Sequence, residues 1–137
     1  MGAIPEFVGE AIGGAATFGM AIYANYYGSM LAFFHGAAIC HAAGFPIKTY
    51  IDQAYVGEST RRHLGEMIAK RSYDDISIAP IEVDAALYEQ VSKLSEELGV
   101  DAEFPNMVTS YLDRAMAEGH DQRELAAIFE VMVPRST

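Results

Sequence analysis

The chain has 137 residues, of which 51% are hydrophobic and 20% charged, and this composition is typical of one globular domain with a single core. Its net charge of −10 at pH 7 argues against nucleic-acid phosphates or an anionic membrane surface as partners. The single cysteine, Cys40, cannot form an internal disulfide, which fits the reducing cytoplasm where we expect the protein.

The longest uncharged stretch runs from Ala11 to Ile47 and contains no Asp, Glu, Lys or Arg. A run of this length is either a membrane span or the centre of a buried interface. Sixteen of its 37 residues are Gly or Ala, and several polar residues interrupt it. Small residues let helices approach closely, and buried polar groups need partners that lipid lacks. We therefore predict a helix enclosed by protein, with a second copy of the chain as its cover and no membrane partner.

The predicted long helix begins at Glu10 and ends at His41 or Ala43, because Gly44 is a good left-handed C-cap and Pro46 cannot continue a helix. About 34 residues at roughly 1.5 Å each give a rod on the order of 50 Å. This is longer than a compact domain of this size needs, so the helix requires another surface to cover it.

Apolar stripes at helical spacing follow the long helix, and no alternating strand pattern longer than three or four residues is present. The fold class is therefore all-α, with one long interface helix and a bundle of four or five shorter helices in an intertwined homodimer. We expect residues 1–9 to be a lead-in and residues 10–137 to form a single helical domain. The expected shorter helices span Pro46–Val56, Glu58–Lys70, Pro80–Leu98 and Phe104–Glu118, with a last helix from Leu125 capped by Asp121 and Glu124.

Motifs for nucleotide or metal binding are not found. The chain has no G-x-G-x-x-G and no G-x-x-x-x-G-K-[ST] sequence, so no phosphate cradle is encoded. His35 and His41 are six residues apart, which places them on different faces of a helix. We predict no metal site and interpret both histidines as hydrogen-bonded groups in a helical interface.

A stripe of phenols lies on the long helix. Gly19, Tyr23 and Tyr27 are spaced i, i+4, i+8, and Tyr26 adjoins the last of them. A buried tyrosine usually finds a hydrogen-bond partner for its hydroxyl. The stripe is either aromatic packing in an interface or a set of phenols that faces a substrate.

Asp84 occupies the apolar stripe formed by Val83, Leu87 and Val91, where an apolar residue is expected. Since this position falls in the first turn of its helix, the carboxylate could simply complement the positive end of the helix dipole. The alternative is a polar group directed into a pocket.

The order of these parts resembles a known family. The chain is similar to the C-terminal domain of the β-hydroxyacid dehydrogenase superfamily, most closely the imine reductase and reductive aminase branch. The matching residues are Val8–Glu10, Gly14–Ala16, Tyr27–Gly28, Phe33–His35, Gly99–Glu103, Leu112–Ala115, Glu118–His120 and Leu125–Ala127.

This resemblance implies an oxidoreductase whose N-terminal Rossmann domain binds NADPH and whose helical C-terminal domain swaps with its twin in a homodimer. Each active site for the small-molecule substrate would then lie between one subunit's Rossmann domain and its partner's helices. The 137 residues begin near the interdomain helix, so we expect a domain fragment or the product of a split gene. With the Rossmann domain absent, we expect neither bound cofactor nor activity from this chain alone.

The resemblance also assigns residues. The family position that often holds an acid aligns with Gly19, the aromatic position two turns later aligns with Tyr27, and a pocket-lining pair aligns with Val83 and Asp84. We predict Tyr27 and Tyr23 as proton-donating residues. The predicted substrate-binding residues are Gly19, Tyr26, Val83 and Asp84.

Two other functions stay open. One is a non-catalytic helical dimer that binds a small apolar ligand between its long helices, which glycine in place of the family's acid favours slightly. The other is a membrane-associated helical protein, which solubility without detergent would exclude.

Overall fold

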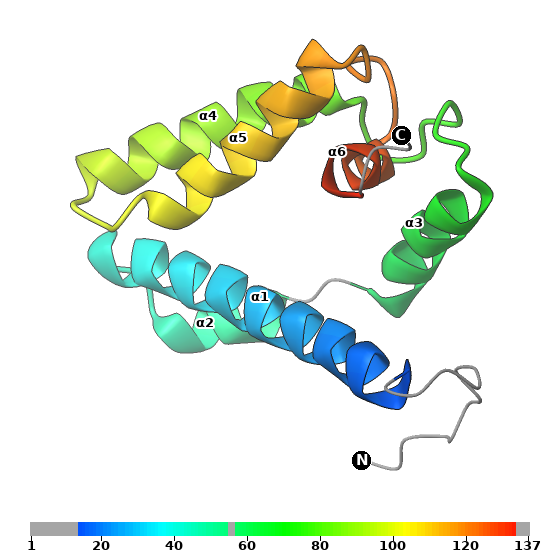
Figure 1. Cartoon of the computed structure of the whole chain (residues 1–137). Coiled ribbons are helices and arrows are strands. Elements are labelled where there is room, and N and C mark those ends of the chain that lie inside the picture. The colour runs from blue at the N-terminus through cyan, green and yellow to red at the C-terminus, as the bar shows by residue number, and fades with distance from the viewer. Residues whose placement is uncertain (1–13, 55–56, 134–137) are drawn as a thin grey trace. The chain divides into compact units, whose positions relative to one another are not determined.

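The computed structural model describes residues 14–54 and 57–133. Over these ranges its only regular elements are helices, and the only β-type pairing is one isolated bridge between Pro80 and Glu124. The predicted all-α class is therefore confirmed. In chain order the elements are α1 (Gly14–Ala42), α2 (Ile47–Gln53), α3 (Glu58–Lys70), α4 (Ile81–Glu97), α5 (Glu103–Ala117), the 3-10 helix η1 (Leu125–Ile128) and α6 (Phe129–Met132) (Figure 1).

The predicted end of the long helix is confirmed. After Ala42 the chain turns at Gly44, whose φ of 79° lies in the left-handed region. The Gly44 N–H donates to the His41 carbonyl at 3.1 Å, and the Phe45 N–H donates to the Cys40 carbonyl at 2.8 Å. This pair of bonds is a Schellman C-cap, which satisfies carbonyls that the helix end leaves free. The predicted start at Glu10 lies outside the described residues.

The same cap ends three further helices. Gly99 after α4 and Gly119 after α5 have φ of 68° and 86°. Arg71 takes this place after α3 with φ 52°, although a residue with a Cβ rarely adopts that conformation. Contacts with α6 hold the Arg71 side chain, because its guanidinium pairs with Glu130 and lies 5.2 Å from the centre of the Phe129 ring.

The chain divides into two compact units, Met1–Phe34 and His35–Thr137. In its described part the first unit consists of the N-terminal portion of α1, and the second contains the end of α1 with all other helices. The predicted lead-in over residues 1–9 lies outside the described residues. The expectation that residues 10–137 act as a single domain stays a prediction.

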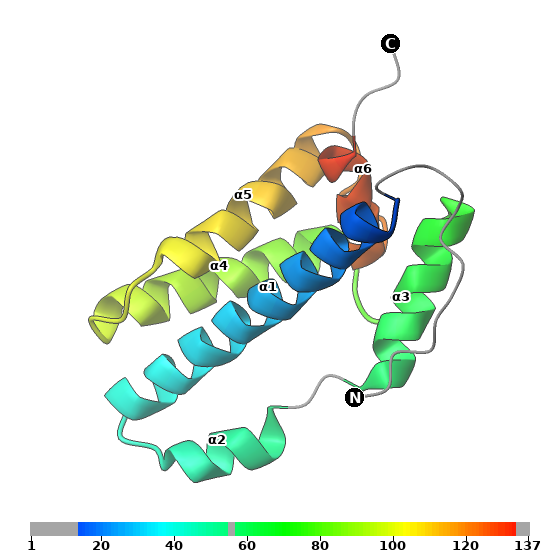
Figure 2. The same ribbon diagram turned by 60° about the horizontal axis from the view of Figure 1, so that its bottom comes forward.

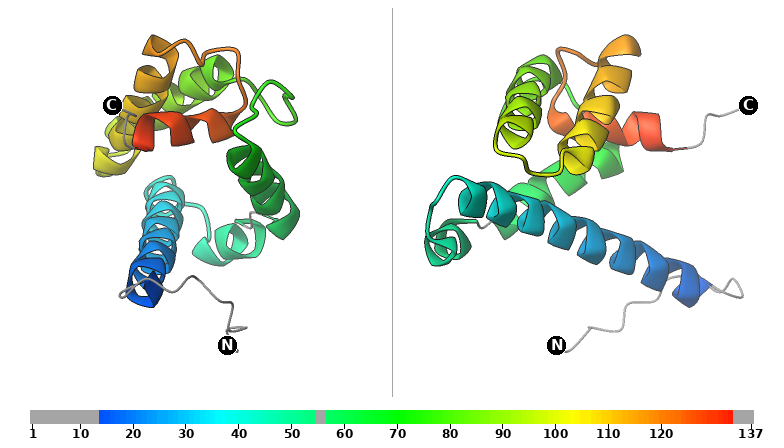
Figure 3. Two further views of the ribbon diagram at one scale, coloured as in Figure 1. Left: turned by 45° about the vertical axis from the view of Figure 1, so that its right-hand side comes forward. Right: turned by 90° about the vertical axis from the view of Figure 1, so that its left-hand side faces the viewer.

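The core of the second unit forms where α3, α5, η1 and α6 meet the N-terminal end of α4. Helices α4 and α5 lie side by side and antiparallel (Figure 2). The η1–α6 segment packs against α5, and η1 also contacts α3 (Figure 3). The buried apolar side chains of this core are Met67, Tyr73, Ile81, Leu112, Ala115, Ala126, Ala127 and Val131.

The predicted capping box before the last helix is wrong. Glu124 itself occupies the N-cap position of η1, and its carboxylate accepts the Leu125 N–H at 2.9 Å. The same carboxylate accepts the backbone N–H groups of Ser77 and Ile78 at 2.7 and 2.9 Å. Asp121 instead contributes its carbonyl, which accepts the N–H of Glu82. Glu124 therefore connects the loop after α3 to η1, a long-range role that local spacing did not indicate.

Helix α1 exposes large apolar side chains on more than one of its sides. Six large side chains in the described part of its N-terminal portion are at least half exposed in the single chain, namely Phe18, Met20, Ile22, Tyr23, Leu31 and Phe34. They fall at irregular intervals, so no single polar face opposes an apolar one. A membrane span is not indicated, since none of the helices in the described ranges combines the length and apolar character that crossing a bilayer requires.

Candidate functional site

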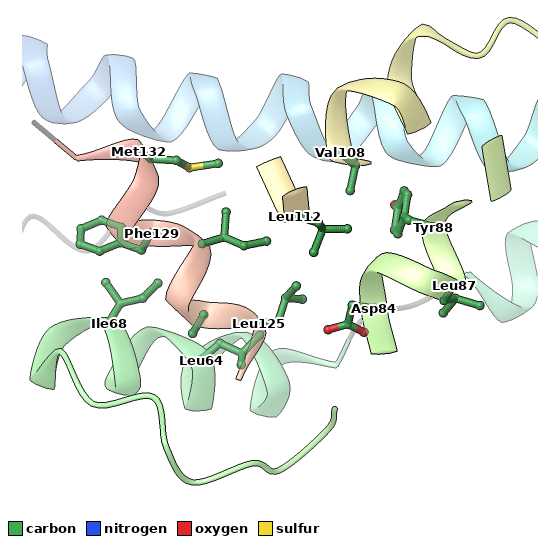
Figure 4. Close-up of a pocket in the computed structure, with 12 residues that line it drawn as sticks. Leu64, Ile68, Asp84, Leu87, Tyr88, Val108, Leu112, Leu125, Phe129 and Met132 are labelled. Carbon is green, nitrogen blue, oxygen red and sulfur yellow. The ribbon is translucent and has the colours of Figure 1, made fainter. Parts of the chain in front are cut away.

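Five helical segments of the second unit, α3, α4, α5, η1 and α6, line a partly open cavity of about 440 Å³ (Figure 4). Eleven of its twelve lining residues are apolar or aromatic, and the twelfth is Asp84. A volume of this size suits a small organic molecule. The lining residues are Leu64, Ile68, Asp84, Leu87, Tyr88, Val108, Leu112, Leu125, Ala126, Ile128, Phe129 and Met132.

Asp84 reaches this cavity from the first turn of α4. The helix begins after Pro80, whose carbonyl accepts the N–H of Asp84 at 3.3 Å. The Asp84 Oδ2 atom is buried and has no hydrogen-bond partner among the described residues. Figure 4 shows the carboxylate directed into the space that faces Leu125. Asp84 thus lies in the first turn of α4 and also lines the cavity, so both alternatives for its role stay open.

The electrostatics of Asp84 follow from this position. Burial raises the pKa of its carboxyl, and the negative charge of Glu124 raises it further. None of the twelve lining residues is Lys, Arg or His, so no basic side chain offsets the Asp84 charge inside the cavity. Its Oδ2 atom is therefore an acceptor without a partner among the described residues, next to an otherwise apolar lining.

The pKa of Glu124 shifts in the opposite direction, because its carboxylate accepts several hydrogen bonds. Burial alone would raise the pKa of Glu124, but the N–H groups of Ile78, Ser77 and Leu125 outweigh it and lower the pKa. Its side chain is fully buried and ionised at neutral pH. Glu124 thus holds a negative charge near Asp84 but does not itself line the cavity.

The resemblance aligns Val83 and Asp84 with a pocket-lining pair, but only Asp84 lines the cavity in the structure. Val83 is about half exposed and does not line the cavity, whereas Leu87 and Tyr88, one turn further along α4, do. Apolar spacing could have identified Leu87, which belongs to the same stripe as Asp84. The contributions of α3, η1 and α6 could not be found in this way, because they depend on how five segments pack.

The phenolic stripe lies on α1 as predicted from its spacing. Gly19, Tyr23 and Tyr27 are one helical turn apart within a continuous helix. The Tyr23 side chain is 58% exposed, and a Cβ added at Gly19 would meet nothing within 4 Å. The side chains of Tyr26 and Tyr27 lie outside the described part of the structure. The catalytic and substrate-binding roles of this stripe stay predictions.

The two histidines of α1, His35 and His41, have different surroundings. His35 Nε2 lies 3.2 Å from the Asp101 carbonyl and 3.3 Å from Ser95 Oγ, and its ring lies 5.6 Å from that of Phe104. Ser95 Oγ donates its only proton to the Val91 carbonyl, so the Nε2–H tautomer satisfies this site. His41 is exposed. Within residues 14–54 and 57–133 no group of three His, Cys, Asp or Glu residues could hold a metal.

One wall of the cavity is held by a cluster at α6. Glu130 accepts the Tyr73 hydroxyl at 2.5 Å and pairs with the Arg71 guanidinium, while Arg114 Nη2 donates to the Val131 carbonyl at 2.7 Å. Burial and the bond to Glu130 raise the pKa of Tyr73 to about 12. These contacts position a helix of four residues, which is too short to be stable by itself. The cluster thereby supports the cavity-lining residues of α6.

A family model described as the NADPH-dependent reductive aminase-like C-terminal domain matches residues 11–134. No curated protein sequence matches the chain.

Several solved structures share the fold. An imine reductase from Pseudomonas sp. superposes with a TM-score of 0.83 at 21% identity, over 94% of this chain and 46% of that one. An imine reductase from Myxococcus stipitatus in complex with NADP+ gives 0.80 at 16% identity, over 89% and 44%. A reductive aminase from Aspergillus terreus in complex with NADPH and ethyl-5-oxohexanoate gives 0.74 at 20% identity, over 83% and 41%. The chain thus spans less than half the length of these proteins.

Proposed function

Because this chain belongs to the NADPH-dependent reductive aminase-like C-terminal domain family, we propose that it is the dimerisation and substrate-pocket domain of an oxidoreductase that reduces imines or carbonyl compounds. The observation that carries the proposal is the match over residues 11–134, nearly the whole chain. The cavity between α3 and α6 supports it, since a mostly apolar space of about 440 Å³ suits a small organic substrate.

The cavity does not fit NADPH itself. Its lining offers apolar side chains and one carboxylate, and it contains no cation to pair with phosphate groups. In the proposed enzyme the cofactor is held by a separate Rossmann domain, from which it supplies the hydride. The contribution of this chain is to bind the substrate, exclude water and provide the proton that the reduced nitrogen or oxygen takes up.

We propose Tyr27 or Tyr23, or a water molecule that they hold, as the source of that proton. Glycine at position 19 cannot donate one, although the resemblance aligns this position with the family's acid. A phenol with a pKa of about 10 can act as an acid only when it lies close to the accepting atom. We also propose Gly19, Tyr26, Val83 and Asp84 as substrate-binding residues.

A homodimer through α1 completes the proposal. A helix that is apolar on all sides is normally buried on all sides, yet large side chains of α1 are at least half exposed in the single chain. Gly19 and Gly28 leave open space above the helix backbone, which lets a second helix approach closely. A second copy of the chain presents the same apolar helix surface, so we propose it as the partner that covers α1.

A chimera tests the catalytic proposal. In it, this chain replaces the corresponding part of the Pseudomonas sp. imine reductase, and NADPH consumption is followed with cyclic imines and with ketone–amine mixtures. We expect turnover from the chimera, a large loss when Tyr23 and Tyr27 are both changed to Phe, and no turnover from the chain alone. An unchanged rate in the double variant would refute the assignment of the phenols, and turnover by the chain alone would refute the need for a second domain.

A second function is a non-catalytic helical dimer that binds a small apolar ligand. Glycine at position 19 favours it, because this residue leaves α1 without the aligned acid. A chimera that folds, dimerises and binds NADPH but reduces none of these substrates would support this function over the first.

A further inference from the structure

Arg71 is the only residue other than glycine that has a positive φ in the described part of the chain. Its φ of 52° costs free energy that glycine does not incur at the ends of α1, α4 and α5, where Gly44, Gly99 and Gly119 take the same conformation. Glycine at position 71 would end α3 at a lower cost. The contacts of the arginine side chain are therefore the feature that needs an explanation.

These contacts hold α6. The Arg71 guanidinium pairs with the Glu130 carboxylate and lies 5.2 Å from the centre of the Phe129 ring. The Tyr73 hydroxyl donates to the same carboxylate from the loop after α3. Because a helix of four residues is not stable by itself, the position of α6 depends on such contacts.

The segment before α6 is attached in a different way. Ala126 and Ala127 of η1 are buried, and the fully buried Glu124 caps this segment. In α6 only Val131 is buried, whereas Met132 lines the cavity and is 56% exposed. A lining residue with this much exposure lies at the rim of the cavity. The η1 segment therefore belongs to the core, and α6 belongs to the rim.

We propose that α6 is a strap at the rim of the cavity and that Arg71 is the latch that holds it closed. When the latch is released, Phe129 and Met132 leave the lining and the cavity opens, while η1 and the rest of the second unit stay folded (Figure 4). The strap controls the access of a ligand, so its biological meaning rests on the proposed function. The motion itself does not depend on that function.

This role explains arginine at position 71. A residue that only ends a helix in the left-handed conformation would be glycine. A latch requires a side chain that pairs with a carboxylate and also packs its charged plane against a ring, and arginine does both. The strained φ is then the cost of placing this side chain on Glu130 and Phe129.

Amide hydrogen exchange of the whole 137-residue chain, followed by NMR, tests the proposal. The reporter of α6 is the Val133 N–H, which donates to the Phe129 carbonyl at 3.2 Å. The reporter of η1 is the Ala127 N–H, which donates to the Glu124 carbonyl at 2.8 Å. Exchange at each amide reports how often its own segment opens.

Arg71→Gly separates the latch from the helix end, because it relieves the strained φ and removes both side-chain contacts. We expect exchange at Val133 to become at least about tenfold faster relative to exchange at Ala127. If Arg71 served only to end α3, exchange at both amides would be unchanged or slower, and this result would overturn the proposal. Equal acceleration at both amides would also overturn it, because the whole unit would then be destabilised.

Two further variants are matched to this one. Lys70→Ala removes an exposed positive charge one residue earlier, and exchange at Val133 should not change. Arg71→Lys keeps a charge that can pair with Glu130, so it should restore part of the protection that Arg71→Gly removes. Acceleration by Lys70→Ala as large as that by Arg71→Gly would overturn the assignment of the latch.

Thiol labelling shows whether the open strap exposes the cavity. Ala126 lines the cavity and is only 7% exposed, so Ala126→Cys in a Cys40→Ser chain places a single thiol there. We expect an aromatic disulfide reagent to react at least about tenfold faster when Arg71→Gly is added. Unchanged labelling would refute the control of access. If the labelled chain does not fold, hydrogen exchange still decides whether the strap opens.

Failure of this proposal is distinct from failure of the proposed function, because exchange is measured on the chain and turnover on the chimera. A chimera that reduces imines, together with a chain in which Val133 does not respond to Arg71→Gly, would refute the strap alone. A strap that opens as described in a chain whose chimera reduces nothing would refute the reductase alone.

Discussion

Glu124 and Ile78 are 46 residues apart in the chain, and the Glu124 carboxylate accepts the Ile78 backbone N–H at 2.9 Å. The same oxygen accepts the N–H of Ser77, and the second oxygen accepts that of Leu125. One buried carboxylate therefore satisfies three backbone donors from two segments. It fixes the loop that leads into α4, the helix from which Asp84 enters the cavity.

Changing Glu124 to Gln should destabilise the fold, because an amide has one accepting oxygen and no charge. We expect a loss of about 2–4 kcal/mol in the free energy of unfolding at neutral pH, measured by urea denaturation. Since the folded-state pKa of Glu124 is lowered, its contribution is complete above the unfolded pKa of 4.5 and is lost as pH falls through the folded value. The difference between the two proteins should therefore shrink in acid. Exposed Glu66→Gln is the control, and equal stabilities at neutral pH would contradict the prediction.

Changing Asp84 to Asn should alter the pH dependence of stability in the opposite direction. Burial and the Glu124 charge raise the folded-state pKa of Asp84 above its ordinary value of 3.8. The folded state then binds more protons than the unfolded state in this window, so stability falls as pH rises through it. Asp84→Asn has no carboxyl to ionise at this position, so it does not lose stability in this way. The free energy of unfolding of the variant should therefore rise relative to that of the unaltered chain as pH increases. Urea denaturation across the acid range checks this, and parallel curves would refute it.

Gly36 and Tyr50 form a contact that leaves no room for a Cβ at position 36 unless the Tyr50 side chain moves. A Cβ added there would overlap the Tyr50 hydroxyl, with ring carbons Cζ and Cε2 at 2.7 and 2.9 Å. Gly36→Ala should therefore destabilise the chain by about 1–3 kcal/mol, despite the better helix propensity of alanine.

Thermal unfolding of Gly36→Ala in a Tyr50→Ala background tests whether the contact with Tyr50 causes the destabilisation. In a Tyr50→Ala background the overlap is gone, and Gly36→Ala should stabilise by up to about 1 kcal/mol through helix propensity. Gly65 in α3 has nothing within 4 Å of an added Cβ, so Gly65→Ala serves as the matched control and should stabilise. The same destabilisation by Gly36→Ala in both backgrounds would rule out the contact as its source.

Removing the hydroxyl of Tyr73 should weaken the attachment of α6. Tyr73→Phe loses the bond to the Glu130 carboxylate, and we expect a cost of about 1.5–3 kcal/mol, typical of a hydrogen bond to a charged group. The pKa of Tyr73 is raised from 10.0 to about 12 by burial and by Glu130. The unfolded state therefore loses this proton first, and the stabilisation by Tyr73 falls as pH rises from 10.0 towards about 12.

Urea denaturation of both proteins at neutral and alkaline pH measures this effect. The gap between them should narrow in alkali, since Tyr73→Phe has no proton to lose at this site. A gap that stays constant with pH would show that Tyr73 acts through packing alone.

The sequence predicted features that depend on single residues. Gly44, Gly99 and Gly119 mark helix ends because only a residue without a Cβ adopts a left-handed φ at little cost. Arg71 takes the same conformation without such a mark, and its contacts with α6 are visible only in the folded chain.

Features that depend on distant segments could not be predicted. Spacing assigned Glu124 to a local capping box, whereas its partners lie in the loop after α3. Asp84 left two alternatives open, because its surroundings are decided by the packing of α5 and η1 against α4. The cavity combines five segments, and no periodicity within one of them indicates the others.

Sedimentation equilibrium of the chain at micromolar concentration tests the central claim most directly, namely that a second copy covers α1. We predict a stable particle of twice the 14.9 kDa chain mass, which Ile22→Glu and Leu31→Glu on exposed positions of α1 dissociate. A folded 14.9 kDa monomer at that concentration would contradict the claim.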